Sequence, residues 1–151
     1  MAAMELMLRP ARPTDASDVA EIFLAAYAEM RPYVRDVHTD DEIRAWIGDV
    51  VLHENEIVIA EVDGRPAGFA ALVADLLGHL YVHPDLQRRG IGDVLLARVK
   101  ELRPRGFRLW VFQRNTGARR FYERQGLRLV KLTDGSGNEE REPDALYEWR
   151  P

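Results

Sequence analysis

The chain has 151 residues, of which 46% are hydrophobic and 30% charged, and its formal net charge is −4. This composition is typical of one globular domain spanning residues 1–151, and no apolar run approaches the roughly 20 residues that cross a bilayer, so we expect no membrane association. The acidic balance argues against nucleic acid as a partner, and the absence of cysteine, which excludes a disulfide and a thiol nucleophile, fits a cytoplasmic protein.

The first half of the chain alternates between strand and helix patterns. Alternating apolar residues predict strands, and apolar residues at a spacing of three to four predict helices. Thr39 and Glu42 have the spacing of a capping box at the start of a helix. The predicted elements are a strand at 6–8, a helix from Thr14 to Met30, a helix after Thr39 with the apolar stripe Ile43, Trp46, Ile47 and Val50, and a hairpin of strands 56–62 and 67–74.

The second half continues with strands separated by two helices. Gly126 is well placed as the residue that ends the second of these helices. The predicted elements are a strand at 77–82, a helix with Ile91, Leu95, Val99 and Leu102 on one face, an apolar and therefore central strand at 107–112, a helix at 117–125, and strands at 127–132 and 145–149. This order predicts one α/β domain with a mixed sheet.

A short basic loop with two glycines joins the strand at 77–82 to the next helix. It reads Gln87-Arg88-Arg89-Gly90-Ile91-Gly92. Glycine lets a ligand approach the backbone closely, and the amides at a helix N-terminus lack partners within the helix. Such a loop favours a pyrophosphate, although a plain strand-to-helix turn remains the alternative. The loop lacks the Gly-Lys-Ser/Thr pattern of nucleotide triphosphate sites and the third glycine of dinucleotide sites.

Three motifs together resemble one family. The loop at 87–92 matches the Q/R-x-x-G-x-G/A coenzyme A loop of the GCN5-related N-acetyltransferase (GNAT) superfamily. The LYVHP segment at 80–84 is similar to that family's fourth strand, and RNTGARRFYERQGL at 114–127 to its later motif. The resemblance covers nearly the whole chain. It implies an α/β fold with a mixed, mostly antiparallel seven-stranded sheet, about four flanking helices, and splayed fourth and fifth strands.

The resemblance also implies an activity and a set of residues. It predicts an N-acetyltransferase that uses acetyl-CoA as cosubstrate, without a metal, and transfers the acetyl group directly to a primary amine. By similarity the general acid is Tyr122, because a tyrosine beside the sulfur can protonate the departing thiolate. The residues implied to bind the cosubstrate are Tyr81, Val82 and Asn115 for the pantetheine arm, and Gln87, Arg88, Arg89, Gly90, Ile91, Gly92 and Asp93 for the phosphates. Arg119, one helical turn after Asn115, is a further candidate for the phosphates.

The general base is left open by the sequence. Many relatives in the superfamily carry a glutamate near the start of the fourth strand, where this chain has Leu76 beside Asp75. Asp75 and His79 are therefore the candidate bases, although His79 also fits a plain sheet position. The chain's four histidines do not have metal-ligand spacing.

The acceptor pocket is implied to involve the loop between the first two helices. Tyr33 and His38 are candidate substrate contacts, with Tyr27 or Trp46 as walls. The acidic stretch 134–144 either favours a cationic acceptor or is a solvated loop. The acceptor is expected to be a small-molecule amine or a peptide amine, an acyl group other than acetyl remains open, and a homodimer is compatible with the resemblance.

Two other functions stay open at this point. A non-catalytic module of the same fold would bind acetyl-CoA or CoA and regulate a partner. A nucleotide-binding domain unrelated to acyl transfer would bind ATP or NAD in preference to acetyl-CoA.

Overall fold

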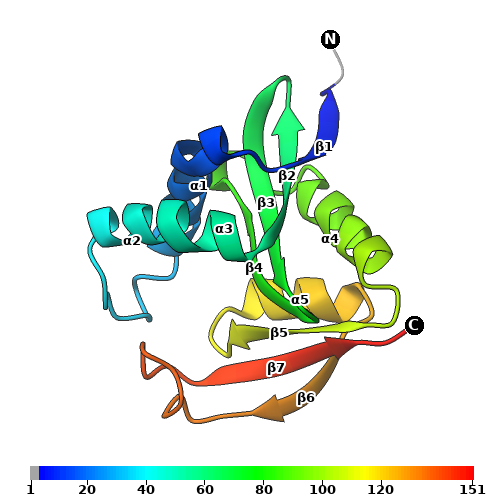
Figure 1. Cartoon of the computed structure of the whole chain (residues 1–151). Coiled ribbons are helices and arrows are strands. Elements are labelled where there is room, and N and C mark those ends of the chain that lie inside the picture. Colours follow the sequence, from blue (N-terminus) through cyan, green and yellow to red (C-terminus); the bar gives the residue numbers. More distant parts are fainter. Residues whose placement is uncertain (1–3) are drawn as a thin grey trace.

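The computed structural model describes residues 4–151 as a seven-stranded sheet with helices on both faces (Figure 1). The strands lie in the order β1-β2-β3-β4-β5-β7-β6, and every neighbouring pair is antiparallel except β4 and β5. The expected mixed, mostly antiparallel sheet is thus confirmed. The strands are β1 (Leu6–Pro10), β2 (Glu56–Val62), β3 (Arg65–Val73), β4 (Leu76–Val82), β5 (Phe107–Phe112), β6 (Arg128–Leu132) and β7 (Asp144–Trp149).

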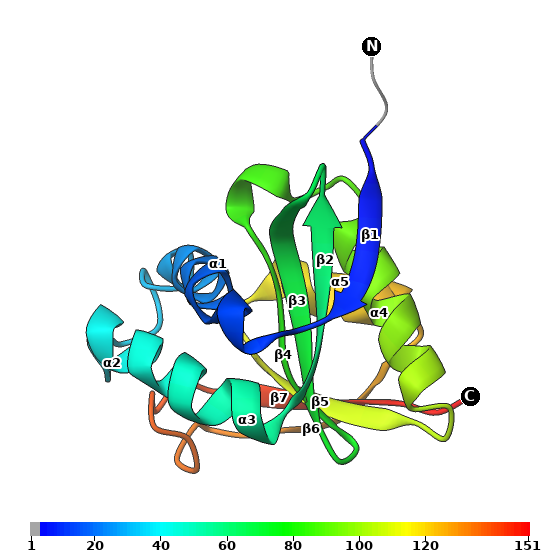
Figure 2. The ribbon, with the colours of Figure 1, turned by 45° about the horizontal axis from the view of Figure 1, so that its top comes forward.

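Two helical layers enclose the sheet, as Figure 2 shows. On one face lie α1 (Ala16–Ala28) and the stretch formed by α2 (Asp40–Trp46), a π-helical turn (Ile47–Val51) and α3 (Leu52–Glu54). On the other face lie α4 (Ile91–Leu102) and α5 (Thr116–Arg124). The predicted capping box at Thr39 is present, because its hydroxyl accepts from the Glu42 amide at 3.1 Å and the Glu42 carboxylate accepts from the Thr39 amide at 3.0 Å.

The buried stripe of α2 differs from the predicted one. The buried residues are Ile43, Ile47 and Val51, whereas the Trp46 side chain is 38% exposed. The π-helical turn explains the difference, because a π turn needs more residues per turn than an α turn and therefore carries the buried face from Ile47 to Val51. Trp46 is consequently free to contact the rings of neighbouring elements.

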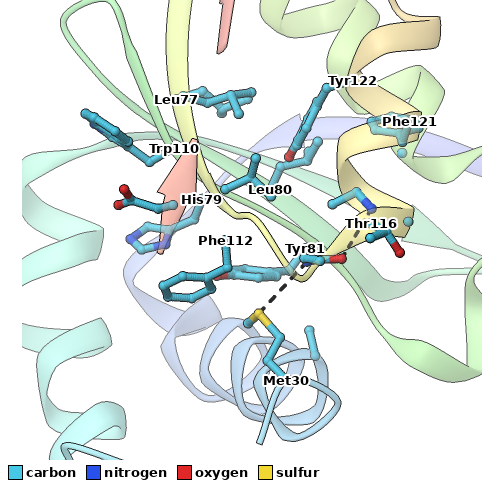
Figure 3. Close-up of a pocket in the computed structure, with 18 of the residues that line it drawn as sticks. Met30, Leu77, His79, Leu80, Tyr81, Trp110, Phe112, Thr116, Phe121 and Tyr122 are labelled. Atoms are coloured by element: carbon cyan, nitrogen blue, oxygen red, sulfur yellow. Dashed lines mark hydrogen bonds between the residues drawn. The ribbon is translucent and has the colours of Figure 1, made fainter. Parts of the chain in front are cut away.

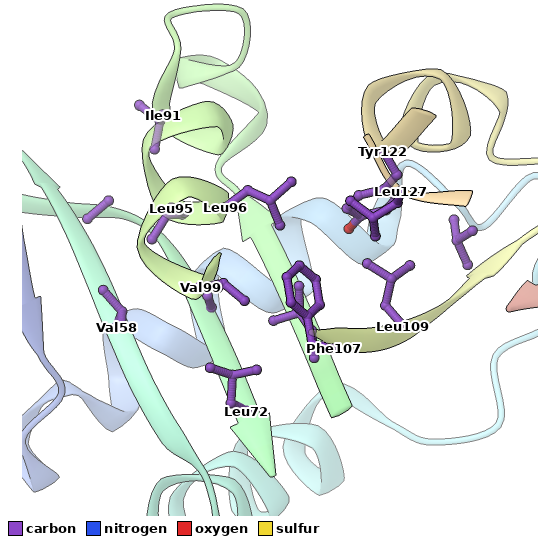
Figure 4. Close-up of a cluster of buried hydrophobic side chains, with 14 of the residues drawn as sticks. Val58, Leu72, Ile91, Leu95, Leu96, Val99, Phe107, Leu109, Tyr122 and Leu127 are labelled. Carbon is purple, nitrogen blue, oxygen red and sulfur yellow. The ribbon is translucent and has the colours of Figure 1, made fainter. Parts of the chain in front are cut away.

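The two faces of the sheet bury separate hydrophobic clusters. The cluster under α4 and α5 joins apolar residues of both helices to alternate residues of β5, including Leu95, Phe107 and Leu109 (Figure 4). The cluster under α1 and α2 includes Phe23 and Ile47. Gly126, with a φ of +89°, ends α5 as predicted, since the Leu127 amide donates to the Tyr122 carbonyl at 3.0 Å.

The β4–β5 contact determines where a ligand can enter the sheet. These two strands pair at a single register position, Leu76 with Arg108, and diverge beyond it. The expected splay of the fourth and fifth strands is therefore confirmed. β5 is interior in the strand order, as predicted, but it pairs along its full length only with β7. The free edge of β4 thus faces an open space in the middle of the sheet.

A buried ion-pair network joins β1 to the start of α1. The Asp15 residue is only 5% exposed, and its carboxylate accepts two hydrogen bonds from the Arg9 guanidinium, each at 2.8 Å. Arg9 also contacts the Glu61 carboxylate on β2. The hydrogen bonds from Arg9 hold the pKa of Asp15 below its ordinary value of 3.8.

Asp15→Asn is expected to lower the free energy of unfolding by about 1–3 kcal/mol at pH 7, because charge-assisted hydrogen bonds to the partly buried Arg9 guanidinium are lost. A carboxylate with a lowered pKa stabilises the fold above the pKa it has when unfolded and loses that contribution as the pH falls through the lowered pKa. The difference between wild type and variant should therefore shrink below about pH 4. Urea unfolding at several pH values measures this difference in the free energy of unfolding. Asp18→Asn, at an exposed position of α1, is the matched control. An equal loss in both variants would contradict a role for the network.

Candidate active site

A cleft of about 1520 Å³ opens where β4 and β5 separate. Residues 78–82 of β4 form one wall and residues 109–112 of β5 form the other. The 87–93 loop and the first two turns of α5 line one end, while the end of α1 and the β6–β7 loop line the other end. Since backbone groups on an unpaired strand edge can bind an extended ligand, this edge of β4 suits a linear chain such as pantetheine. Tyr81 and Val82, predicted to contact that arm, both line the cleft.

The loop before α4 presents unpaired amides to the cleft. Arg88 and Gly90 have φ values of +64° and +81°, so the backbone turns sharply here. The first amide that bonds within the helix is that of Val94, which donates to the Gly90 carbonyl at 3.1 Å. Within residues 4–151, no backbone hydrogen bond engages the amides of residues 88–93. The loop therefore offers several free donors at the positive end of a helix dipole, which is an arrangement that binds phosphate.

The side chains of the loop have different roles. Gln87 donates to the Val82 carbonyl at 3.3 Å and thus ties the loop to the end of β4. Asp93 accepts from the Gln125 side chain at 2.5 Å, which links α4 to the end of α5. Arg88 lines the cleft, but Arg89 is exposed and does not.

The basic residues that α5 contributes are not the one predicted from the sequence. Arg119 does not line the cleft; its Nε donates to the Tyr147 hydroxyl at 3.0 Å, beneath the helix. Arg120 and Arg124 line the cleft instead. These two residues lie four apart, on the same face of the helix as Thr116, so their spacing in the sequence is the signal that would have found them.

Tyr122 reaches the cleft from the buried face of α5. The residue is 8% exposed and packs against Phe121 and Tyr147 with ring centroids 5.3 and 6.5 Å away. Figure 3 shows its ring extending from the helix into the pocket. Its hydroxyl has no hydrogen-bond partner within residues 4–151, and burial raises the pKa of the phenol, so it stays protonated at neutral pH. A protonated hydroxyl in this position can donate to a leaving group.

Asn115 caps α5 and also lines the cleft. Its side-chain carbonyl accepts from the Ala118 amide at 3.2 Å, and its amide group faces the Met30 sulfur at 4.0 Å. The dashed line from Met30 in Figure 3 marks this second contact. The side chain is therefore held between α5 and the end of α1, beside the wall formed by β5.

Asp75 is not at the site. It is exposed in the turn between β3 and β4, where its backbone carbonyl accepts from the Arg108 amide at 2.8 Å. That turn lies at the closed end of the β4–β5 splay, beyond the Leu76–Arg108 pair, and Asp75 does not line the cleft. In this structure, therefore, Asp75 does not reach the cleft where the reacting atoms would lie.

His79 lies on the β4 wall of the cleft. Its ring is surrounded by those of Phe23, Trp46 and Tyr81, at centroid distances of 5.6, 5.4 and 6.0 Å. Burial lowers the pKa of His79 to about 4, because the aromatic surroundings do not solvate an imidazolium. The imidazole is therefore neutral at physiological pH.

The acceptor end of the cleft is aromatic and carries charges of both signs. Tyr33, Trp110 and Phe112 supply the rings, and Glu29 and Glu140 supply carboxylates that no ion pair within residues 4–151 engages. Arg114 and Lys131 also line the cleft, over the rings of Tyr33 and Trp110. Burial is the main cause that raises the pKa of Tyr81, with smaller contributions from Tyr27 and Glu140.

His38 stands outside the cleft lining, at the rim. Its Nε2 lies 3.1 Å from a Glu139 carboxylate oxygen, and this contact raises the pKa of the imidazole. The pair connects the loop before α2 to the β6–β7 loop. His38 is thereby placed to hold the two loops together at the mouth of the acceptor end.

The acidic composition of the β6–β7 loop predicts a loop exposed to solvent, but only part of the loop is exposed. Glu139 is exposed, but Glu142 is 5% exposed and lies 2.9 Å from the Arg114 Nε. Asn138 bonds to the Glu142 amide and carbonyl at 3.2 and 2.8 Å. Arg114 also stands over the Tyr33 ring at 5.9 Å. The loop is thus internally bonded and anchored to the acceptor wall.

Within residues 4–151, no cluster of three or more histidine, aspartate or glutamate side chains has a geometry that could hold a metal ion. In the same residues, no helix combines the length and the apolar character needed to cross a membrane.

One known protein family has a sequence model that matches this chain. The sequence model of the Acetyltransferase (GNAT) domain matches residues 53–128, which include β4, the glycine loop, α4, β5 and α5. The chain belongs to the GNAT acetyltransferase family. The predicted membership is thus confirmed, and the matched span contains the loop and Tyr122.

Individual GNAT relatives agree with this membership. The peptidyl-lysine N-acetyltransferase YiaC of Escherichia coli is 29% identical over 125 residues, covering 82% of this chain and 84% of that protein. A GCN5-related N-acetyltransferase from Rhodopseudomonas palustris has the same fold, with a TM-score of 0.80, 23% identity and coverage of 100% and 99% of the two chains. The PaiA N-acetyltransferase of Thermoplasma acidophilum, solved in complex with coenzyme A, has a TM-score of 0.74, 20% identity and coverage of 97% and 99%.

Proposed function

We propose that this GNAT protein transfers an acetyl group from acetyl-CoA to a primary amine, by direct attack of the amine on the thioester. The observation that carries the proposal is the free edge of β4 lying between the unpaired amides of residues 88–93 and the Tyr122 hydroxyl. Each of these features matches one part of acetyl-CoA, namely the pantetheine arm, the pyrophosphate and the sulfur. The coenzyme A complex of the structural neighbour PaiA supports the same assignment.

In the proposed reaction, the chain's own residues position the thioester and protonate its leaving group. The loop amides, with Arg88, Arg120 and Arg124, hold the phosphates and fix the depth of the pantetheine arm in the cleft. The amine nitrogen attacks the acetyl carbonyl carbon, the carbon–sulfur bond breaks, and the Tyr122 hydroxyl gives its proton to the departing sulfur. The attacking nitrogen then loses its surplus proton to water, and the Tyr122 phenolate takes a proton back from water. Direct attack needs no covalent acetyl-enzyme, which agrees with the absence of cysteine.

The acceptor's proton is proposed to leave to solvent before attack. Asp75 lies outside the cleft, and an imidazole with a pKa of about 4 is too weak a base for an ammonium group with a pKa near 10. We therefore expect kcat/KM for the amine to rise about tenfold per pH unit between roughly pH 6 and pH 9, following the fraction of free amine. An inflection in that range that is the same for amines of different pKa would indicate a base on the enzyme.

The first test is calorimetric titration with acetyl-CoA, with ATP and NAD in separate runs. Binding of acetyl-CoA alone supports the proposal, and preferential binding of ATP or NAD overturns it. A thiol reagent then measures amine-dependent release of CoA without background from the protein, because the chain has no cysteine. Binding of acetyl-CoA without release of CoA by any amine would favour the non-catalytic regulatory module.

The first acceptors to test are lysine side chains. The relative YiaC is named a peptidyl-lysine N-acetyltransferase, and the acceptor end here carries the carboxylates of Glu29 and Glu140 beside aromatic rings. Such an end attracts an ammonium group on a flexible aliphatic chain. A peptide with a free lysine and a blocked N-terminus, compared with one with a free N-terminus and no lysine, separates the two kinds of peptide amine.

A further inference from the structure

The two nitrogens of His79 have unequal surroundings. Nδ1 is buried and has no hydrogen-bond partner in the described part of the chain. Nε2 belongs to a side chain that lines the cleft and is not among the buried atoms without a partner. Figure 3 shows the His79 side chain among the residues that line the pocket.

The groups facing the ring come from three elements and carry no charge at neutral pH. They are Phe23 of α1, Trp46 of α2 and Tyr81 of β4. Only Tyr81 can titrate, and burial raises the pKa of its hydroxyl, so it stays neutral. Burial is also the cause of the lowered pKa of His79, with no contribution from a charged side chain. No side chain in ring contact with His79 could serve as a counter-ion to an imidazolium; the carboxylates of Glu140 and Asp144 line the same cleft, but the lowered pKa of His79 has no contribution from them.

A histidine that acts as a base through Nε2 needs its proton on Nδ1, and that N–H is normally held by a carboxylate or a carbonyl. Nδ1 of His79 has no such partner. A neutral imidazole carries one N–H and one lone pair, and an N–H left unpaired in an apolar site is costly. The arrangement therefore favours the lone pair on the buried Nδ1 and the proton on Nε2, where cleft water or a ligand can accept it.

We propose that His79 carries its proton on Nε2 and donates a hydrogen bond into the cleft, to an oxygen of the bound thioester or acceptor, in place of acting as the general base. The part of this proposal that concerns substrate rests on the proposed acetyl transfer. The tautomer is a property of the protein alone, so it can be tested whether or not the protein turns over.

Long-range ¹H–¹⁵N NMR of the full chain distinguishes the two tautomers directly. The His79 signals are assigned as those missing from His79→Gln, which leaves His38, His53 and His83 in place. We expect the Nε2-protonated pattern for His79, unchanged from pH 5.5 to pH 8. An Nδ1-protonated pattern, or a titration of His79 within that range, would overturn the proposal.

Two substitutions test the role in the reaction. His79→Gln places an amide N–H near the position of Nε2–H, and we expect it to retain turnover within about threefold with an unchanged pH profile. His79→Phe keeps an aromatic ring among Phe23, Trp46 and Tyr81 but removes the donor, and we expect a loss of about tenfold or more, in line with the removal of one preorganised donor.

Thermal unfolding of both variants shows whether His79→Phe is folded, and comparisons use only folded protein. Loss of activity in His79→Gln with a changed pH profile would identify a base and contradict the proposal, and so would full activity in His79→Phe. If the wild type transferred no acetyl group, the proposed function would fail while the NMR result still decided the tautomer.

Discussion

Tyr122→Phe is expected to reduce turnover by about 100-fold or more while changing acetyl-CoA affinity by less than about threefold. General acid catalysis contributes factors of about 10²–10⁴, and the phenol hydroxyl matters mainly when charge develops on the sulfur. The ring keeps its packing against Phe121 and Tyr147, and the hydroxyl has no protein partner to lose within residues 4–151. Stability should therefore hardly change. Initial rates and calorimetric titration of the same preparation measure both quantities.

Tyr147→Phe is the matched control for this experiment. It removes a hydroxyl from the neighbouring ring, but that hydroxyl donates to Glu123 at 2.7 Å and accepts from Arg119 outside the cleft. We expect it to lower the free energy of unfolding by about 1–3 kcal/mol and to leave turnover within about twofold. If Tyr122→Phe and Tyr147→Phe lost activity equally, or if Tyr122→Phe lost affinity as much as rate, Tyr122 would not be the general acid.

Gly92→Val is expected to weaken acetyl-CoA binding by at least about 100-fold, or about 2.7 kcal/mol. A Cβ at this position would contact the Phe121 ring at 3.4 and 3.6 Å, which are ordinary van der Waals distances. The two further methyl groups of valine would crowd that ring and the space in front of the unpaired amides, so the phosphates could not approach the backbone. Valine is otherwise tolerated in the first turn of a helix, and the fold should persist in circular dichroism.

Gly92→Ala separates the side chain's bulk from the loss of glycine itself. Because only the single Cβ is added, at ordinary contact distance, we expect it to bind acetyl-CoA within about threefold of wild type. Calorimetric titration of the three proteins gives the comparison. Normal binding by a folded Gly92→Val would remove the 87–93 loop from the phosphate site.

The elements were predictable from the sequence because their local patterns agree with the packing. The Thr39–Glu42 capping box, the glycine that ends α5 and the hairpin of β2 and β3 were all predicted, and each depends on residues close together in the chain. The stripe of α2 was not, because a π-helical turn shifts the buried face from Val50 to Val51 and leaves Trp46 outside it. A pattern read at 3.6 residues per turn does not include such a turn.

The site was predictable where it depends on backbone and less so where it depends on side-chain direction. Tyr81, Val82 and the loop residues other than Arg89 line the cleft, and their contact with the cosubstrate stays a prediction. Arg119 does not line it, because rotation about the α5 axis directs it to Tyr147 and brings Arg120 and Arg124 to the cleft. Asp75 is next to β4 in sequence but lies at the closed end of the splay. Which side chains face the cleft depends on how the helices and strands pack together, and the sequence of one segment does not determine that.

The single β4–β5 pair has a consequence for the protein without its cosubstrate. A strand in the middle of the sheet presents the exposed backbone of an edge strand, and such edges recruit other extended chains, including those of misfolded or aggregating neighbours. A bound pantetheine arm would act as a non-protein strand that closes this gap and joins the β1–β4 half of the sheet to the β5–β7–β6 half. Because such a ligand binds only the folded chain, the free energy of unfolding would rise with the concentration of cosubstrate.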